Sequence, residues 1–338
     1  MSRPNYDEEP YLSIRKACET DDVDLLSRVI TPEMVAMKPM PDRTFTLLDF
    51  ACDTSIRHNA TSVLSYVVSD CKFNVQSLDT GNIAGISNVS TGILDILLAH
   101  GWDINGYDLS SPRKQLPFLW RVLSKDYLVS YCLSHGADVY PRGQPPIDPN
   151  FITVELRNCP PLLERAAAYS TVATFDLLRS HGAPMGWRAL HLAVQEATHP
   201  WLTGRPDSTR ELMSDREHDK AYTYAERMAM VRHLVEDVGL DVNALDQPVT
   251  QKHVPTFHRG TPLCYVSDSE VIEGLYRGHT VIADTRELTW YLLDQGADPT
   301  QALEVIKHSQ HPTFAADVEM WRAQRKLAAS KHSRCMIQ

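Results

Sequence analysis

The sequence lacks the long apolar runs and the excess of positive charge that two large classes of protein need. No stretch of its 338 residues approaches the roughly 18 consecutive apolar residues of a membrane-spanning helix. No apolar run follows the first charged residues in MSRPNYDEEPYL, as one would in a secretory signal peptide. The formal net charge is −10, which disfavours a surface that follows nucleic-acid phosphates. We therefore expect a cytoplasmic protein that binds no nucleic acid.

Paired cysteines and the short motifs of catalysis are missing as well. The seven cysteines are an odd number with no C-x-x-C pair, a pattern typical of a reducing compartment. Cys18 and Cys52 each follow an alanine within a helical pattern, where a small buried residue is expected. The chain has no G-x-S-x-G, H-E-x-x-H, P-loop or G-x-G-x-x-G segment. The sequence thus predicts no catalytic residue and no cofactor.

Fourteen histidines raise the question of a metal site. His100, His135 and His181 each lie directly before a glycine at the end of a predicted helix, where a cation interacts favourably with the helix dipole. Equivalent positions on neighbouring packed helices stand about 10 Å apart. Ligands of one zinc ion must lie within about 2.1 Å of it, so these three side chains cannot share a metal. We predict no metal site.

The chain does contain a repeat, made of two alternating patterns. In the first, an apolar helical run is closed by glycine, which can adopt the left-handed conformation that caps a helix. Its five copies are LLAHGWDIN (97–105), CLSHGADVY (132–140), LLRSHGAPM (177–185), VEDVGLDVN (235–243) and LLDQGADPT (292–300). In the second, a turn leads into a short helix with small residues. Its four copies are TFTLLDFAC (44–52), CPPLLERAA (159–167), WRALHLAV (187–194) and RGTPLCYV (259–266).

This alternation resembles the ankyrin repeat, whose signature T-P-L-H-x-A recurs about every 33 residues. The match is clearest in Thr261-Pro262-Leu263, in Leu190-His191-Leu192-Ala193 and in the Gly-Ala-Asp triplets at 136–138 and 296–298. The resemblance implies an all-α solenoid of stacked helix-turn-helix units with short hairpin loops. It also implies that the His191 ring ties neighbouring turns together by hydrogen bonds, rather than acting as a catalytic base.

The spacing of the repeat predicts the domain organisation. The closing glycines are separated by 35, 46, 57 and 57 residues, so only the first interval is near 33. We place insertions near 141–158, 196–227 and 268–284 within divergent repeats spanning 44–300, part of the second being a helix with apolar residues from Ala221 to Val235. Residues 1–43 are expected to form N-terminal cap helices, 301–330 a C-terminal capping pair, and 331–338 a basic tail. Divergence and insertions of this kind are similar to those of ankyrin proteins in filamentous fungi.

The expected function is non-catalytic: a scaffold or adaptor, monomeric, that binds another protein. Stacked repeats form an extended concave surface, and large side chains at the turn tips are typical interface anchors. Trp102, Tyr107 and Tyr140 are the candidates for partner binding, although Trp102 can equally cover its neighbour's core. A different class of function is an enzyme or small-molecule binder whose pocket is built by the insertions 196–227 and 268–284.

The segment SRCMIQ (333–338) matches the C-a-a-X pattern of prenylation at Cys335. Residues 322–338 contain five basic residues and no acid, so residues 1–321 have a formal charge of −15. A basic segment beside a lipid favours attachment to anionic membranes, which predicts weak membrane association. The alternative is a plain helix end whose basic residues complement the helix dipole. The acidic remainder would favour a basic partner.

Overall fold

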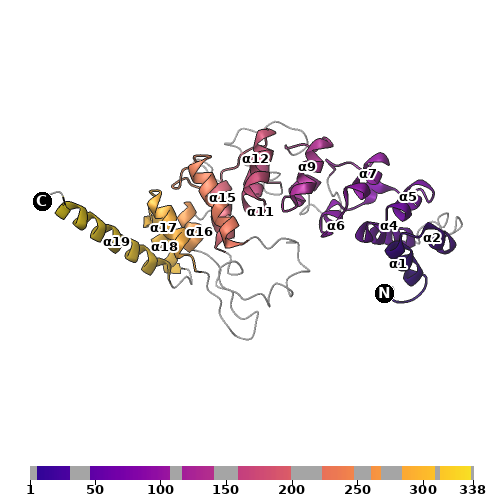
Figure 1. Ribbon diagram of the computed structural model, residues 1–338, viewed down its shortest axis with the longest axis horizontal. Helices are drawn as coiled ribbons and strands as arrows, with labels where there is room; N and C mark the ends of the chain where they lie inside the picture. Colours follow the sequence, from indigo (N-terminus) through magenta and orange to yellow (C-terminus); the bar gives the residue numbers. More distant parts are fainter. Residues whose placement is uncertain are drawn as a thin grey trace. The chain divides into compact units, whose positions relative to one another are not determined.

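The computed structural model describes residues 6–30, 46–106, 116–140, 159–198, 223–246, 260–267, 284–308 and 313–335 (Figure 1). Within these ranges the regular structure is helical and no β-strand occurs, which confirms the all-α class. The chain divides into two compact units, each described below by itself. Unit 1 comprises Met1–Val122 and Tyr127–Asp138, and unit 2 comprises Leu123–Asp126 and Val139–Gln338.

Unit 1 is built of short helices that pack in pairs. They are α1 (Tyr11–Thr20), α2 (Val23–Val29), α4 (Leu47–His58), α5 (Thr61–Ser69), α6 (Thr80–Ala84), α7 (Thr91–Ala99), α8 (Phe118–Arg121) and α9 (Asp126–Ser134), with a 3-10 turn η1 (Val75–Ser77). Helix α1 packs on α2 and α4, α4 packs on α5, and α5 packs on α7. Helices α1 and α2 both lie within residues 1–43, for which cap helices were predicted.

Side-chain caps define where the helices of unit 1 begin. Thr46 and Asp49 form a reciprocal capping box at the start of α4, an arrangement that satisfies backbone donors lacking a partner within the helix. The N-terminus of α5 is capped from another helix pair, because the Asp21 carboxylate accepts the backbone N–H groups of Ser62 (3.1 Å) and Val63 (2.9 Å). These contacts fix the order in which the helices stack.

Unit 2 arranges its helices in two rows. They are α11 (Leu162–Tyr169), α12 (Val172–Ser180), α13 (Ala189–Ala197), α15 (Tyr224–Glu236), α16 (Pro262–Ser267), α17 (Arg286–Asp294), α18 (Thr300–Val305) and α19 (Phe314–Cys335), with a 3-10 turn η5 (Ile306–His308). One row runs through successive contacts from α11 to α13, α16 and α18; in the other, α12 contacts α15, and α17 contacts α19. Helix pairs α11–α12, α13–α15 and α16–α17 link the rows.

The closing glycines adopt the predicted left-handed conformation. Their φ angles lie between 77° and 91° at positions 101, 136, 182, 239 and 296. A residue with a Cβ is strained in this region. The glycine pattern in the sequence therefore located five helix ends correctly.

Three asparagines bridge consecutive turns in a recurring geometry. The Asn105 side chain donates to the Gly136 carbonyl (3.1 Å) and accepts from the Asp138 backbone N–H (2.8 Å). Asn243 bonds Gly296 and Asp298 in the same way, at 3.0 and 2.8 Å. Asn59 makes the corresponding pair of bonds to the Asn88 carbonyl and the Ser90 N–H. One amide thus satisfies both a donor and an acceptor of the next turn.

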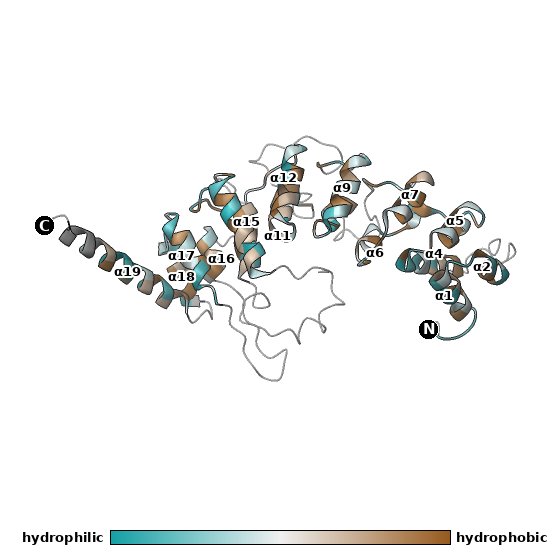
Figure 2. Cartoon of the chain, in the orientation of Figure 1, coloured by the Kyte–Doolittle hydropathy of each residue, from teal (hydrophilic) through white to brown (hydrophobic). Residues whose placement is uncertain are grey.

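The core is a band of aliphatic and small residues between the helices. Figure 2 shows hydrophobic and hydrophilic residues on different sides of most helices. Six of the seven cysteines lie in this band as free thiols: Cys18, Cys52, Cys71, Cys132, Cys159 and Cys264. Their burial confirms the prediction for Cys18 and Cys52.

Helix α15 begins at Tyr224 and buries Met228 and Val231, in agreement with the helix that the apolar spacing predicted within and beyond the end of the second insertion. One predicted boundary differs from the structure. Helix α19 continues to Cys335 instead of ending near Ser330. The segment holds no Gly or Pro and is rich in Ala, Lys and Arg, which favour helix, so residues 331–335 are helical rather than a tail.

Candidate functional site

The turn between α12 and α13 exposes two large apolar side chains. Met185 is 37% exposed and Trp187 is 39% exposed, and the two residues stand on either side of Gly186. Most other large apolar residues of the described chain are buried. Exposed apolar side chains that gather at one place often mark an interaction site. We call residues 182–188 the Met-Trp turn.

Backbone hydrogen bonds fix the first half of the Met-Trp turn. Gly182 has φ +77°, and the following Ala183 N–H returns to the Leu178 carbonyl at 3.1 Å. The Pro184 carbonyl accepts the N–H of Leu163 from α11 at 3.1 Å. The turn is therefore tied both to the helix that precedes it and to a helix of the other row.

A buried ion pair fixes the second half. The Glu164 carboxylate, which is almost fully buried, accepts from the Arg188 backbone N–H (3.1 Å) and from its guanidinium Nε (3.2 Å) and Nη2 (2.9 Å). Burial alone would lower the pKa of Arg188, but the charge and hydrogen bonds of Glu164 raise it above its ordinary value. Arg188 thus stays charged, and its position as the residue before α13 is fixed.

Gly186 is required by this ion pair. A Cβ at position 186 would lie 2.1 Å from Glu164 Oε2 and 2.7 Å from Glu164 Cβ, far inside van der Waals contact. Only glycine allows the backbone to pass so close to the buried carboxylate. The same glycine separates Met185 from Trp187, so both side chains project from a turn that is held close to α11.

Of the three sequence-predicted partner-binding residues, one lies beside this turn. The Tyr140 hydroxyl donates to the Gly182 carbonyl at 2.7 Å, and its side chain is half-buried. Trp102 is only 4% exposed, because its ring packs edge-on against Phe118 with centroids 5.1 Å apart. It covers the core, as the alternative interpretation held, and is no surface anchor. Tyr107 lies outside the described residues.

Sequence reasoning missed Met185 and Trp187. Trp187 was assigned to the start of a repeat unit and Met185 to the end of the one before it, so neither was considered as a surface residue. The sequence signal that could have identified them is Met-Gly-Trp directly after Pro184. The next helix follows so closely that there is no room for a long hairpin, which favours exposure of these side chains. Which of the tryptophans is buried depends on the neighbouring helix pair, which the local sequence does not specify.

Beneath the turn, a buried polar cluster links α13 to the next units. His191 is fully buried, and its Nε2 donates to the Ala244 carbonyl at 3.0 Å, 53 residues further on. The Tyr265 ring contacts the imidazole edge-on, and the Tyr265 hydroxyl donates to Asp246 at 2.7 Å. Burial lowers the pKa of His191, and the Asp246 carboxylate offsets part of this. The tie between neighbouring turns that was predicted for His191 is present.

A buried cation from α15 binds the end of α11. The Arg227 guanidinium from α15 donates to the carbonyls of Ala168 and, at 3.0 Å, Ser170. These carbonyls lie at the C-terminus of α11, where a helix has no internal donors left. Arg227 was not singled out from the sequence, because it lies next to Met228 in a segment identified only by its apolar spacing.

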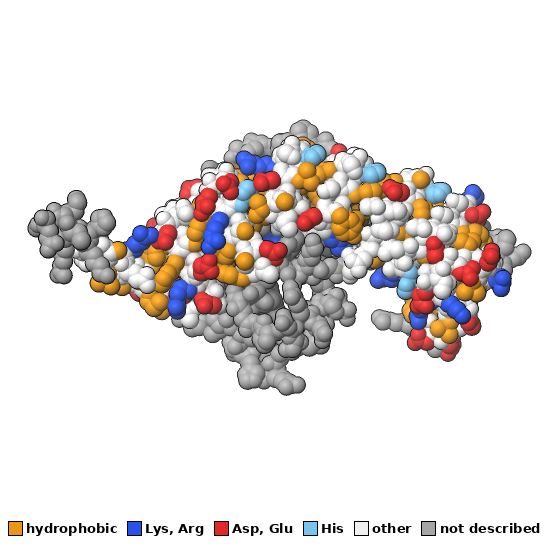
Figure 3. Space-filling view, in the orientation of Figure 1, with side chains coloured by type: hydrophobic (Ala, Val, Ile, Leu, Met, Phe, Trp, Pro, Cys, Tyr) orange, Lys and Arg blue, Asp and Glu red, His pale blue; other side chains and the backbone are white. Residues whose placement is uncertain are grey.

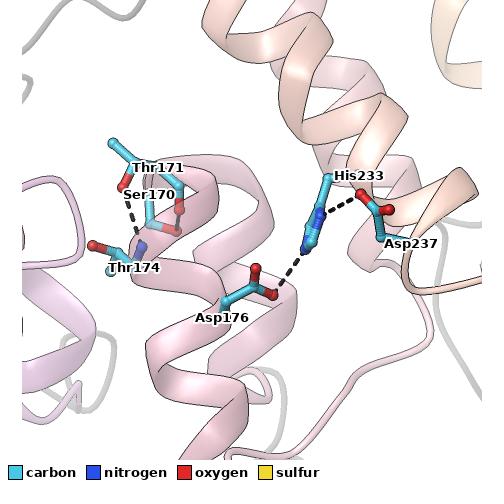
Figure 4. A network of polar contacts seen from close by, with 6 residues as sticks. All are labelled: Ser170, Thr171, Thr174, Asp176, His233 and Asp237. Atoms are coloured by element: carbon cyan, nitrogen blue, oxygen red, sulfur yellow. Dashed lines mark hydrogen bonds and ion pairs between the residues drawn. The ribbon is translucent and has the colours of Figure 1, made fainter.

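A histidine between two carboxylates joins α12 to α15 (Figure 4). His233 Nε2 lies 2.9 Å from Asp176 Oδ1, and its Nδ1 lies 2.9 Å from Asp237 Oδ2. The nearby hydroxyls are engaged elsewhere: Ser170 Oγ donates to backbone carbonyls, and Thr171 Oγ1 accepts the Thr174 N–H. Both imidazole nitrogens are occupied by carboxylates, so this network joins helices and does not pair a base with a nucleophile.

The three histidines predicted at helix ends each form a hydrogen bond with a backbone carbonyl or a serine hydroxyl. His135 and His181 each place Nδ1 2.9 Å from the carbonyl four residues back, and His100 Nε2 lies 3.2 Å from Ser69 Oγ. In the described ranges no three His, Cys, Asp or Glu side chains come together as metal ligands would, and no helix there is long and apolar enough to cross a bilayer.

Two other predicted features fall largely outside the description. Residues 199–222 and 268–283, which contain most of the two insertions proposed to wall a pocket, lie outside the described ranges. Cys335 is the last residue of α19, and its side chain lies outside the described part of the chain. Its prenylation therefore stays a prediction. Labelling in cells with a farnesyl analogue would test it.

Comparison with known proteins adds no assignment. No family model matches the chain, and no curated protein is similar to it.

Proposed function

We propose that the chain is a non-catalytic scaffold that binds another protein through stacked ankyrin-like helix pairs. The two rows of helices in unit 2, the left-handed glycines and the asparagine bridges support this proposal. The bridge at Asn105 spans 33 residues to Asp138, which is the period of ankyrin repeats. The bridge from Asn243 to Asp298 spans 55 residues, and in this proposal the predicted insertion at 268–284 supplies the additional length.

The Met-Trp turn is the observation on which the binding proposal rests. Tryptophan is among the residues most enriched at the energetic centres of interfaces, and methionine adapts to irregular partner surfaces. Ordering a loop on binding costs free energy, and a turn already held by Glu164 and by Pro184 avoids most of that cost. The partner would therefore place an apolar pocket or ridge on this turn.

Electrostatics supports a basic partner. Residues 1–321 have a formal charge of −15, so a partner with a basic rim around its apolar contact would be attracted over a range of about 8 Å at physiological salt. The binding should then weaken as salt is raised, through the association rate more than through the dissociation rate.

Affinity purification with quantitative mass spectrometry tests the proposal. We compare tagged full-length protein with Trp187→Ala and with Met185→Ala. Leu12→Ala is the control, since Leu12 is an equally exposed apolar residue on α1. A partner retained by the wild type and the control but reduced at least about tenfold by Trp187→Ala supports the proposal. Partners that persist in all variants, or no reproducible partner, would overturn it.

A further inference from the structure

Among the described side chains of the C-terminal helix α19, the buried ones lie in its first half. Phe314 and Val318 are fully buried, and the Asp317 carbonyl accepts the Trp290 indole N–H at 2.9 Å. Trp321 then donates to Asp294 at 2.6 Å. These contacts fix the direction in which the helix leaves α17.

Beyond Trp321 nothing in the described chain covers the helix. Every side chain from residue 323 to residue 328 is exposed, and Leu327 is 62% exposed. Residues 323–335 form thirteen helical positions, a length of about 20 Å. Most helices in proteins owe their stability to a covered face, so this segment is suited to lie on a surface that the described chain does not supply.

The composition of the segment indicates the charge of that surface. Arg322, Arg325, Lys326, Lys331 and Arg334 lie in about the last four turns of α19, which contain no acidic residue. Arg322 pairs with Glu319 and Arg325 with Asp294, but these pairs are exposed and contribute little. Figure 3 shows both basic and hydrophobic side chains on the described part of α19.

The exposed apolar residues share one side of the helix. Met320 and Leu327 are seven residues apart, which is two helical turns, and Ala323 lies between them on the same side. By helical spacing Arg322, Arg325 and Lys326 lie on the other sides, whereas Lys331 and Arg334 follow Leu327 on the same side, so the apolar side extends from Met320 to Leu327 and is succeeded by basic residues. Long basic side chains can extend around such a helix to reach phosphates while the apolar side lies in the headgroup region.

We infer that the second half of α19, residues 320–335, is a docking helix for an anionic membrane surface. A flat lipid surface suits a single helix with a narrow apolar side, which has no broad face for a protein groove. The acidic remainder of the chain is repelled by the same surface, so contact is confined to this end. The inference does not depend on the partner-binding proposal or on prenylation of Cys335.

The test is co-sedimentation of purified full-length protein with phosphatidylcholine vesicles, with and without phosphatidylserine. All proteins bear Cys335→Ser, so no lipid on that residue contributes, and the protein with this change alone serves as the wild-type reference. This reference should bind the phosphatidylserine vesicles and lose binding at high salt. Lys326→Glu should reduce binding about tenfold or more, since each basic residue near such a surface contributes about 1 kcal/mol. Leu327→Glu should do the same, and Leu327→Ala, which preserves helix propensity, should have a smaller effect.

Matched controls are available on α1, where Lys16 and Leu12 are also exposed. Lys16→Glu and Leu12→Glu make the same changes in charge and polarity and should leave binding unaltered. Failure of wild type to bind, equal binding to neutral vesicles, or equal losses in the α1 controls would overturn the inference. So would light scattering that finds a wild-type dimer converted to monomer by Lys326→Glu, because the helix would then dock on a second copy.

Discussion

Arg188 donates three hydrogen bonds to Glu164, two from its guanidinium and one from its own backbone N–H. The carboxylate is buried, while the guanidinium is partly exposed to solvent. This asymmetry makes the pair a structural clamp on the Met-Trp turn, and it determines which partner is more costly to remove.

Removing the cation should destabilise the protein more than removing the anion. Arg188→Ala leaves the buried Glu164 charge uncompensated, at an expected cost of about 3 kcal/mol. Glu164→Gln leaves a cation that water can reach, at about 1–2 kcal/mol. Urea unfolding midpoints of the two variants measure the difference. Equal or reversed destabilisation would contradict the burial that we assign to this pair.

Gly186→Ala should be destabilising although alanine is a small residue. Its Cβ would lie 2.1 Å from Glu164 Oε2, so either the turn or the ion pair must shift. We expect a loss of about 2 kcal/mol, in the range of overpacked sites, together with weaker partner binding. Gly92→Ala is the control, because a Cβ there meets only ordinary contacts near 3.7 Å. Thermal unfolding of both variants tests the prediction, which fails if they behave alike.

Mild acid should destabilise the protein through His191. Burial lowers its folded-state pKa below the ordinary 6.5, although Asp246 offsets part of this effect. As pH falls through 6.5, the unfolded chain therefore binds more protons than the folded one, and stability present above pH 6.5 is lost by up to about 1.4 kcal/mol per pH unit. His191→Asn has no such titration. The stability gap between wild type and this variant should thus shrink between pH 8 and pH 5.5, and a constant gap would refute the assignment.

The buried thiols should be unreactive in the folded protein. Burial raises the pKa of Cys18 to about 12 and that of Cys132 to about 12, and it raises the pKa of Cys52 as well. Because the thiolate is the reactive form, alkylation of these residues at pH 8 should be at least about 100-fold slower in native than in urea-unfolded protein. Peptide mass spectrometry over a time course gives the rates. Rapid native modification of Cys18 would show that α1 and α4 separate easily.

The local features of the fold were predictable from the sequence, because short-range physics produces them. Glycines 101, 136, 182, 239 and 296 end helices since no side chain obstructs their left-handed backbone. The alternating apolar patterns gave the helix pairs, and His191 was correctly assigned a structural role. The predicted length of α19 was too short, because the helix continues to Cys335, although the composition of residues 331–335 favours a helix.

The sequence by itself thus determined an all-helical chain, the ends of many of its helices and the uneven distribution of its charge. Only the tertiary structure decided which aromatic residues remain at the surface. Trp102 and Trp187 both belong to turns, yet Phe118 covers the first, while the clamp between Glu164 and Arg188 holds the second partly in solvent. Burial depends on contacts between residues far apart in the chain, and the Asn243 bridge to Gly296 spans 53 residues. No local pattern specifies such contacts, because they form only when the helix pairs stack.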